Sequence, residues 1–157
     1  MLENDLKELE DYIIFLINQS KKHTPTEMIL GNIPHSTVIN FNYSLYKKPL
    51  SINSTTLRKI VRRIDELEKT STYYDELCKR VKNFIEKNIM IGSISYLTKE
   101  LGLNYTTLHK IKDYQLTTPY RLITLENYAK QIRHKLERLD GNENYKWFFK
   151  NIYTWGI

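Results

Sequence analysis

Apolar residues recur at spacings of three and four along most of the chain, which is the period of an amphipathic helix. Residues 2–20, Thr56–Lys69 and Tyr73–Asn88 carry long stripes of this kind, and a fourth long helix is expected from Pro119 to about Leu139. We therefore predict an all-α protein.

Two shorter helices are predicted in the first half. Thr24-Pro25-Thr26-Glu27 has the form of a helix start, with a threonine cap, a proline at the first position and a glutamate three residues after the cap. This helix should end at Leu30, before Gly31. A second short helix should begin at His35, with Val38 and Phe41 facing inward.

Residues 93–129 contain three amphipathic segments separated by two tight breaks. Leu97 and Leu101 lie one helical turn apart and precede Gly102, which can adopt the positive φ of a sharp turn. Asn104, a good N-cap, begins a segment that should end at Asp113. Thr118-Pro119 is expected to cap and start the third segment. This spacing is typical of a helix-turn-helix.

The same stretch resembles the phage repressor/Cro-type helix-turn-helix family. The likeness rests on Leu97, Leu101, Gly102, Asn104, Thr107, Leu108, Ile111, Pro119, Leu125 and Ala129. Thr98 stands where the family usually has alanine, and Ile94 where it usually has a polar residue. The resemblance implies a recognition helix at 104–113 and a repressor-like regulator from a phage or other mobile element.

The chain also contains a repeat of about 69 residues. Apolar and proline positions in residues 36–64 recur in residues 106–132, so we predict tandem helix-turn-helix bundles in units 1–70 and 71–157. The first copy is degenerate, since Gly31 is one residue out of register with Gly102 and Pro34 lies in its turn. The alternative is that two small helical bundles look alike because all amphipathic helices do.

An aromatic C-terminal tail follows the predicted last helix. Such a large aromatic surface should be covered, either by packing on the second unit or by forming a homodimer seam. Its candidate docking or dimer residues are Trp147, Phe148, Phe149, Tyr153 and Trp155.

The net positive charge favours a polyanionic partner, and its distribution indicates that this partner would bind the second half of the chain. The net charge is +6, of which residues 1–69 contribute +1 and residues 70–157 contribute +5. The single cysteine, Cys78, excludes an intramolecular disulfide. The acidic N-terminus resembles no signal peptide, and no apolar run could span a bilayer, so we expect a cytoplasmic protein with no membrane partner.

Double-stranded DNA is the predicted partner of the 104–113 segment, because short polar side chains near the start of a helix can reach base edges in the major groove. The candidates for base contact are Tyr105, Thr106, His109 and Lys110. The candidates for contact with the DNA backbone are Lys99, Asn104, Lys112, Gln115, Thr117, Tyr120 and Arg121.

The first unit offers a weaker version of this face. Its candidates are His35, Ser36, Asn40, Lys47 and Lys48. Ile39 stands where His109 stands in the second unit, and isoleucine reads bases poorly but suits a protein contact. The first unit could therefore bind DNA weakly or bind a protein partner.

The sequence contains no motif that indicates catalysis. The four histidines have no metal-ligand spacing with one another or with Cys78, and there is no glycine-rich phosphate loop. We expect no enzyme, no metal and no cofactor. The main prediction is a sequence-specific, repressor-like transcriptional regulator. The rival is a phage-encoded inhibitor or adaptor that uses the same fold against a protein, and a third, weaker possibility is a replication or recombination accessory factor.

Overall fold

A computed structural model describes residues 2–29, 33–44, 48–112 and 116–138. This part of the chain is helical, and its only strand-like pairing is an isolated antiparallel bridge between Asn53 and Arg121. The elements are α1 (Leu2–Lys22), α2 (Pro25–Ile29), α3 (His35–Tyr43), η2 (Pro49–Ser51), α4 (Ser54–Glu68), α5 (Thr72–Asn88), α6 (Ile94–Leu101), α7 (Tyr105–Lys112) and α8 (Ile123–Arg138). The all-α prediction is confirmed for these residues.

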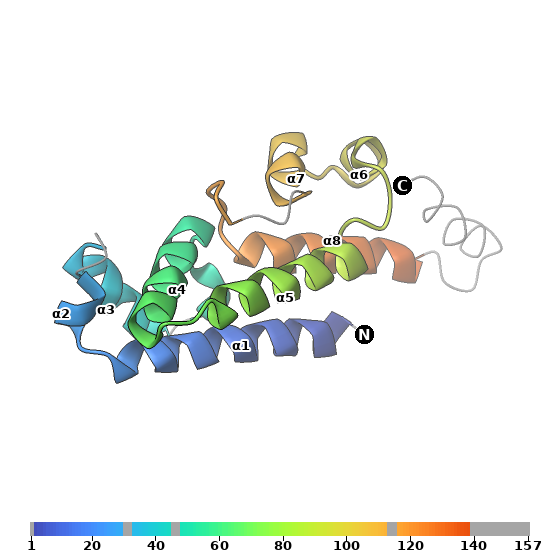
Figure 1. Cartoon of the computed structure of the whole chain (residues 1–157). Helices are drawn as coiled ribbons and strands as arrows, with labels where there is room; N and C mark the ends of the chain where they lie inside the picture. Colours follow the sequence, from blue (N-terminus) through green and yellow to red (C-terminus); the bar gives the residue numbers. More distant parts are fainter. Residues whose placement is uncertain (1, 30–32, 45–47, 113–115, 139–157) are drawn as a thin grey trace.

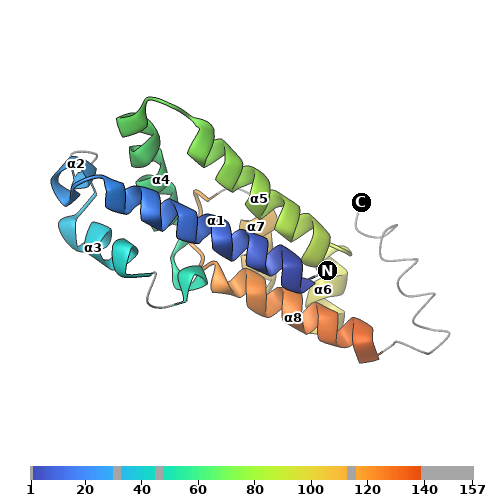
Figure 2. The same cartoon turned by 90° about the horizontal axis from the view of Figure 1, so that it is seen from below.

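The four long helices α1, α4, α5 and α8 pack together at the centre of the molecule (Figure 1). Viewed from below, α1 lies between α5 and α8 (Figure 2). Each of the four buries one stripe, as the apolar period requires. The central residues of these stripes are Leu9, Ile13, Leu16 and Ile17 of α1, Leu57, Ile60, Val61 and Ile64 of α4, Leu77, Val81, Phe84 and Ile85 of α5, and Leu125, Ala129 and Ile132 of α8.

These buried residues form one continuous cluster that draws on both halves of the sequence. The short helices contribute to it as well, through Met28, Val38, Leu97 and Leu108. Helices α2 and α3 pack on α4 and α1 respectively, whereas α6 packs on α7 and α8. The predicted division into units 1–70 and 71–157 stays a prediction about the organisation of the sequence.

Several predicted helix boundaries are confirmed by local hydrogen bonds. At the start of α2, the backbone N–H of Glu27 donates to Oγ1 of Thr24 (3.2 Å), and the backbone N–H of Thr24 donates to Oε1 of Glu27 (3.1 Å). This reciprocal pair is a capping box. It lowers the pKa of the Glu27 carboxyl, because the backbone and hydroxyl donors of Thr24 favour its charged form.

Two predicted boundaries are wrong. The helix expected from Thr56 begins at Ser54, because Oδ1 of Asn53 accepts the backbone N–H of Thr55 (3.0 Å) and caps the helix earlier. The helix expected from Pro119 begins at Ile123. Residues 120–122 of the intervening segment are paired with residues 52–54, so they are not available to an earlier helical turn.

That pairing joins the segments that precede α4 and α8. The backbone N–H of Leu122 donates to the carbonyl of Ile52 (3.1 Å), and that of Ser54 donates to the carbonyl of Tyr120 (2.8 Å). Ser54 is buried, and its Oγ donates to the carbonyl of Thr118 (2.9 Å) while accepting the N–H of Tyr120 (3.1 Å). The two segments are therefore held together by four hydrogen bonds in the described structure.

Some predicted features lie outside the described residues. These are Gly31, Lys47, Asp113, Gln115 and the five aromatic residues proposed for docking or dimerisation, Trp147, Phe148, Phe149, Tyr153 and Trp155. In the described part of the chain, no helix combines the length and the apolar character of a membrane span.

Candidate nucleic-acid interface

Helix α6 has a defined cap at each end. The side chain of Ser93 accepts the backbone N–H of Tyr96 (3.0 Å) at its start. At its end Gly102 has φ +69°, and the N–H of Gly102 and Leu103 donate to the carbonyls of Thr98 (3.1 Å) and Leu97 (3.2 Å). Because L side chains disfavour this left-handed conformation, glycine is the residue that suits the turn.

Helix α7 starts at the predicted cap. Oδ1 of Asn104 accepts the backbone N–H of Thr107 (2.9 Å), and the backbone carbonyl of Asn104 accepts that of Leu108 (3.0 Å). The backbone N–H of Asn104 donates to the hydroxyl of Tyr128 on α8 (3.2 Å). The turn between α6 and α7 is thus fastened to α8 by the side chain of Tyr128.

The inner side of this arrangement is buried as predicted. Fully or almost fully buried are Leu97 of α6, Leu103 of the turn, Leu108 and Ile111 of α7, and Leu125, Ala129 and Ile132 of α8. With its apolar side in this shared interior, α7 exposes residues of its opposite side.

The outward face of α7 carries the residues predicted to contact bases. Tyr105 is 58% exposed, Thr106 and His109 are exposed, and Lys110 is half-buried. The rings of Tyr105 and His109 pack edge to face, with 4.4 Å between their centroids and an interplanar angle of 63°. An aromatic pair of this kind restricts both side chains on an otherwise small polar surface.

The residues predicted to contact the DNA backbone differ in their exposure to solvent. Lys99, Lys112, Thr117 and Arg121 are exposed, and Asn104 is exposed but uses its side-chain oxygen as the cap of α7. The prediction for Tyr120 is wrong, since it is 6% exposed and packs in the core. Its burial follows from the pairing with Ser54, which turns this residue inward.

Electrostatics around α7 favour an anion. The last turn of α7 carries His109, Lys110 and Lys112, which also suit the negative end of the helix dipole. Lys99 and Arg121 add positive charge on the neighbouring elements, and Glu100 is the acidic residue among the described residues of α6 and α7.

The corresponding face of the first unit is also accessible. His35, Ser36, Asn40 and Lys48 are exposed, and Tyr43 is 60% exposed. Pro34 is the N-cap residue of α3 and supplies no side-chain hydrogen bond, in contrast to Asn104. Ile39 is half-buried, so α3 presents a smaller polar face than α7.

Helix α4 carries a cluster of four basic residues, Arg58, Lys59, Arg62 and Arg63. Two of them have partners within the protein. Nε and Nη2 of Arg63 donate to the backbone carbonyl of Glu27 (2.9 and 2.7 Å), and Nη1 donates to Glu66 (2.9 Å). The guanidinium of Arg62 lies over the ring of Tyr74, 4.1 Å from its centroid. Arg62 and Arg63 therefore tie α4 to α2 and α5.

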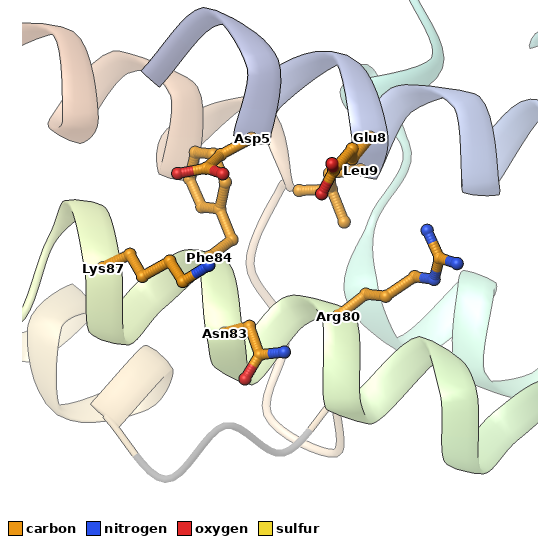
Figure 3. A pocket seen from close by; sticks show the side chains of 7 residues that line it. All are labelled: Asp5, Glu8, Leu9, Arg80, Asn83, Phe84 and Lys87. Atoms are coloured by element: carbon orange, nitrogen blue, oxygen red, sulfur yellow. The ribbon is translucent and has the colours of Figure 1, made fainter. Parts of the chain in front are cut away.

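A pocket lined mainly by polar side chains lies between the first turns of α1 and the second half of α5 (Figure 3). Asp5 and Glu8 project from α1, and Arg80, Asn83 and Lys87 project from α5 on the facing side. Opposite charges are balanced across it, which suits the joining of two helices better than the binding of a charged ligand. Within the described part of the chain, no cluster of histidine, cysteine, aspartate and glutamate could hold a metal ion.

Comparison of the chain with protein-family models, with curated proteins and with solved structures finds no match.

Proposed function

We propose that the protein is a sequence-specific double-stranded DNA-binding regulator, repressor-like in kind, with α7 as its recognition helix. The observation that carries the proposal is the outward face of α7. It is exposed at Tyr105, Thr106 and His109, starts at a capped turn, and stands on a buried apolar interior shared with α6 and α8.

Thr106 and Lys110 are the proposed base readers. They lie one turn apart on α7, so both can reach the floor of one major groove. A threonine hydroxyl can bond to a base edge and its methyl can contact a thymine methyl, whereas lysine donates to guanine acceptors. Lys99, Lys112 and Arg121 would contact phosphates and set the register without reading sequence.

We further infer that α2 and α3 form a second, diverged helix-turn-helix. The elements of the two halves follow one order, a long helix, two short helices and a long helix. Helices α5, α6, α7 and α8 start 70, 69, 70 and 69 residues after α1, α2, α3 and α4. This regularity supports an internal duplication.

The decisive experiment measures binding to a pool of random duplex DNA as salt concentration rises. A groove reader displaces counterions, so log Kd should rise linearly with log salt, with a slope of about 0.9 per phosphate contact. Four contacts would give a slope between about 3 and 4. The double variant Thr106→Ala with Lys110→Ala should abolish selection of the bases that α7 contacts.

The charge-matched control is Lys79→Ala, which removes an exposed lysine on α5. It should retain both the affinity and the sequence preference. Absence of salt-dependent binding by the unaltered protein, or equal losses in the two variants, would contradict the proposal.

A protein-binding inhibitor or adaptor is the alternative, and a specific surface favours it. Phe15 on the acidic helix α1 is 42% exposed, and its ring centroid lies 5.7 Å from that of Tyr12 and 6.0 Å from that of Tyr73. Exposed aromatic groups of this kind are frequent at protein interfaces. Under this alternative, Phe15→Ala should abolish binding of the partner protein, whereas Thr106→Ala with Lys110→Ala should preserve it.

A further inference from the structure

The two halves of the chain match in their buried positions as well as in the order of their helices. Met28, Ile33, Val38 and Phe41 are buried in the first half, and the residues 69 or 70 positions later, Leu97, Leu103, Leu108 and Ile111, are buried in the second. The long helices match with an offset of 68, since Leu9, Ile13, Leu16 and Ile17 correspond to Leu77, Val81, Phe84 and Ile85. The helix pairs α2–α3 and α6–α7 thus stand on equivalent interiors.

The segments that pair with each other are themselves equivalent. Pro49 and Pro119 lie 70 residues apart, as do Ile52 and Leu122, which are both buried and joined by a hydrogen bond of 3.1 Å. The bridge between Asn53 and Arg121 is antiparallel. When two equivalent segments pair in opposite directions, the copies to which they belong are related by a local twofold axis at the pairing.

The arrangement of the helices agrees with this axis. Helices α4 and α8 both begin at the paired segments and run away from them in different directions (Figure 1). The α2–α3 pair lies at the left end of the molecule, and the α6–α7 pair lies on the other side of this junction, above α5 and α8 (Figure 1). One chain therefore has the layout of a helix-turn-helix dimer.

We propose that a single chain binds one DNA duplex through both α3 and α7, each in its own major-groove segment. The inference rests on the proposed function of α7 and assigns α3 a DNA-binding role. The contact surface of α3 consists of His35 and Ser36 in its first turn, Asn40 about one turn further on, and Lys48 beyond the helix. Ser36 and Asn40 occupy the positions equivalent to Thr106 and Lys110, and asparagine is suited to a bidentate contact with adenine.

The two half-sites must differ in sequence. Ile39 replaces the equivalent His109, and Asn40 replaces Lys110, so the two helices offer different hydrogen-bonding groups. A symmetric dimer of identical chains reads a palindrome, whereas this chain would read an asymmetric site. Half-site centres should lie about one helical turn, roughly 10 bp, apart or at a multiple of that distance.

The test begins with a site selected from random duplexes by the full chain. The mass of the complex in solution should correspond to one chain per duplex. Ser36→Ala with Asn40→Ala should weaken binding about 10-fold to 100-fold and remove protection from one side of the footprint. Thr106→Ala with Lys110→Ala should remove protection from the other side. Inserting 5 bp between the half-sites should weaken binding as strongly as losing one helix.

The outcomes separate this inference from the proposed function. Two chains per duplex, or a footprint that Ser36→Ala with Asn40→Ala leaves unchanged while Thr106→Ala with Lys110→Ala destroys it, would overturn the role of α3 and leave that of α7 intact. No specific binding by the unaltered chain would overturn both. All four side chains point to solvent or lie half-buried, and unchanged circular dichroism of each variant checks that it folds.

Discussion

Tyr120 has a different role in the structure from the one that the sequence predicts. Its place beside Arg121, after the proposed recognition helix, suggested a phosphate contact, yet it is buried and its hydroxyl has no hydrogen-bond partner among the described residues. Burial raises its pKa, because desolvation disfavours the charged phenolate, and the Cys78 thiolate that forms at alkaline pH adds to this by charge repulsion.

Alkaline unfolding should report on Tyr120. An unfolded tyrosine ionises near pH 10, whereas Tyr120 keeps its proton to a higher pH when folded, so its contribution to stability is complete below about pH 10 and is lost above it. Tyr120→Phe should reduce the fall in the free energy of unfolding by about 1.4 kcal/mol per pH unit between pH 10 and 12. Urea denaturation across this range measures the slope.

At neutral pH the same variant should be at least as stable as the unaltered protein, because it removes a buried hydroxyl without a partner, which typically costs about 1 to 3 kcal/mol. The control is Tyr105→Phe, which changes a tyrosine that is 58% exposed. Tyr12 and Tyr96, whose pKa values burial raises to about 12, remain in both variants, so the alkaline fall is reduced and does not disappear. A neutral-pH loss in Tyr120→Phe comparable to a deleted hydrogen bond would contradict this account.

At the scale of elements, Asp65 joins the end of α4 to the start of α5. Its carboxylate is 6% exposed and accepts the backbone N–H of Tyr73 (3.1 Å) and of Tyr74 (3.0 Å). Ser71 is the N-cap residue of α5, but its side chain makes no cap hydrogen bond. An acid from the preceding helix thus satisfies the start of α5, as the positive end of the helix dipole favours.

Asp65→Ala should lower the free energy of unfolding by about 2 to 3 kcal/mol, since two N–H groups at a buried helix start lose a charged acceptor. Asp65→Asn keeps one acceptor oxygen and should cost less. Asp75→Ala is the matched control, because Asp75 is an exposed acid in the first turn of the same helix and should matter by less than about 1 kcal/mol. Equal losses in Asp65→Ala and Asp75→Ala, measured by urea denaturation, would exclude the capping role.

The elements also show why sequence predicted one part of this site and missed another. The turn at Gly102 and the side-chain cap at Asn104 are made by hydrogen bonds between residues at most six positions apart, and Leu108 and Ile111 follow the local helical period. The sequence therefore indicated the turn and the buried side of α7. The start of α8 depends on hydrogen bonds to Ile52 and Ser54, which lie 70 and 66 residues from their partners. Contacts over such a separation leave no local period in the sequence.

At the scale of the whole molecule, the two copies of the repeat share one buried core. The repeat predicts two units, and α1, α4, α5 and α8 of both units contribute to one cluster of buried residues. Two copies that arose by duplication can fuse their interiors in this way, as the two subunits of an obligate dimer do. In such an arrangement the helix pairs at the two ends are held at a fixed separation, which recognition of two half-sites requires.

A shared core predicts cooperative unfolding across the repeat. Leu16 of α1 is fully buried, so Leu16→Ala should cost about 2 to 5 kcal/mol. Hydrogen exchange of backbone amides should then accelerate in α8 by the same free energy as in α1, since both helices open only when the common cluster opens. Leu125→Ala on α8 should have the reciprocal effect on α1. Lys7→Ala, an exposed change on α1, should alter neither helix. If Leu16→Ala accelerated exchange in α1 and left α8 protected, the halves would be independent domains, and the fixed spacing of α3 and α7 would lose its structural basis.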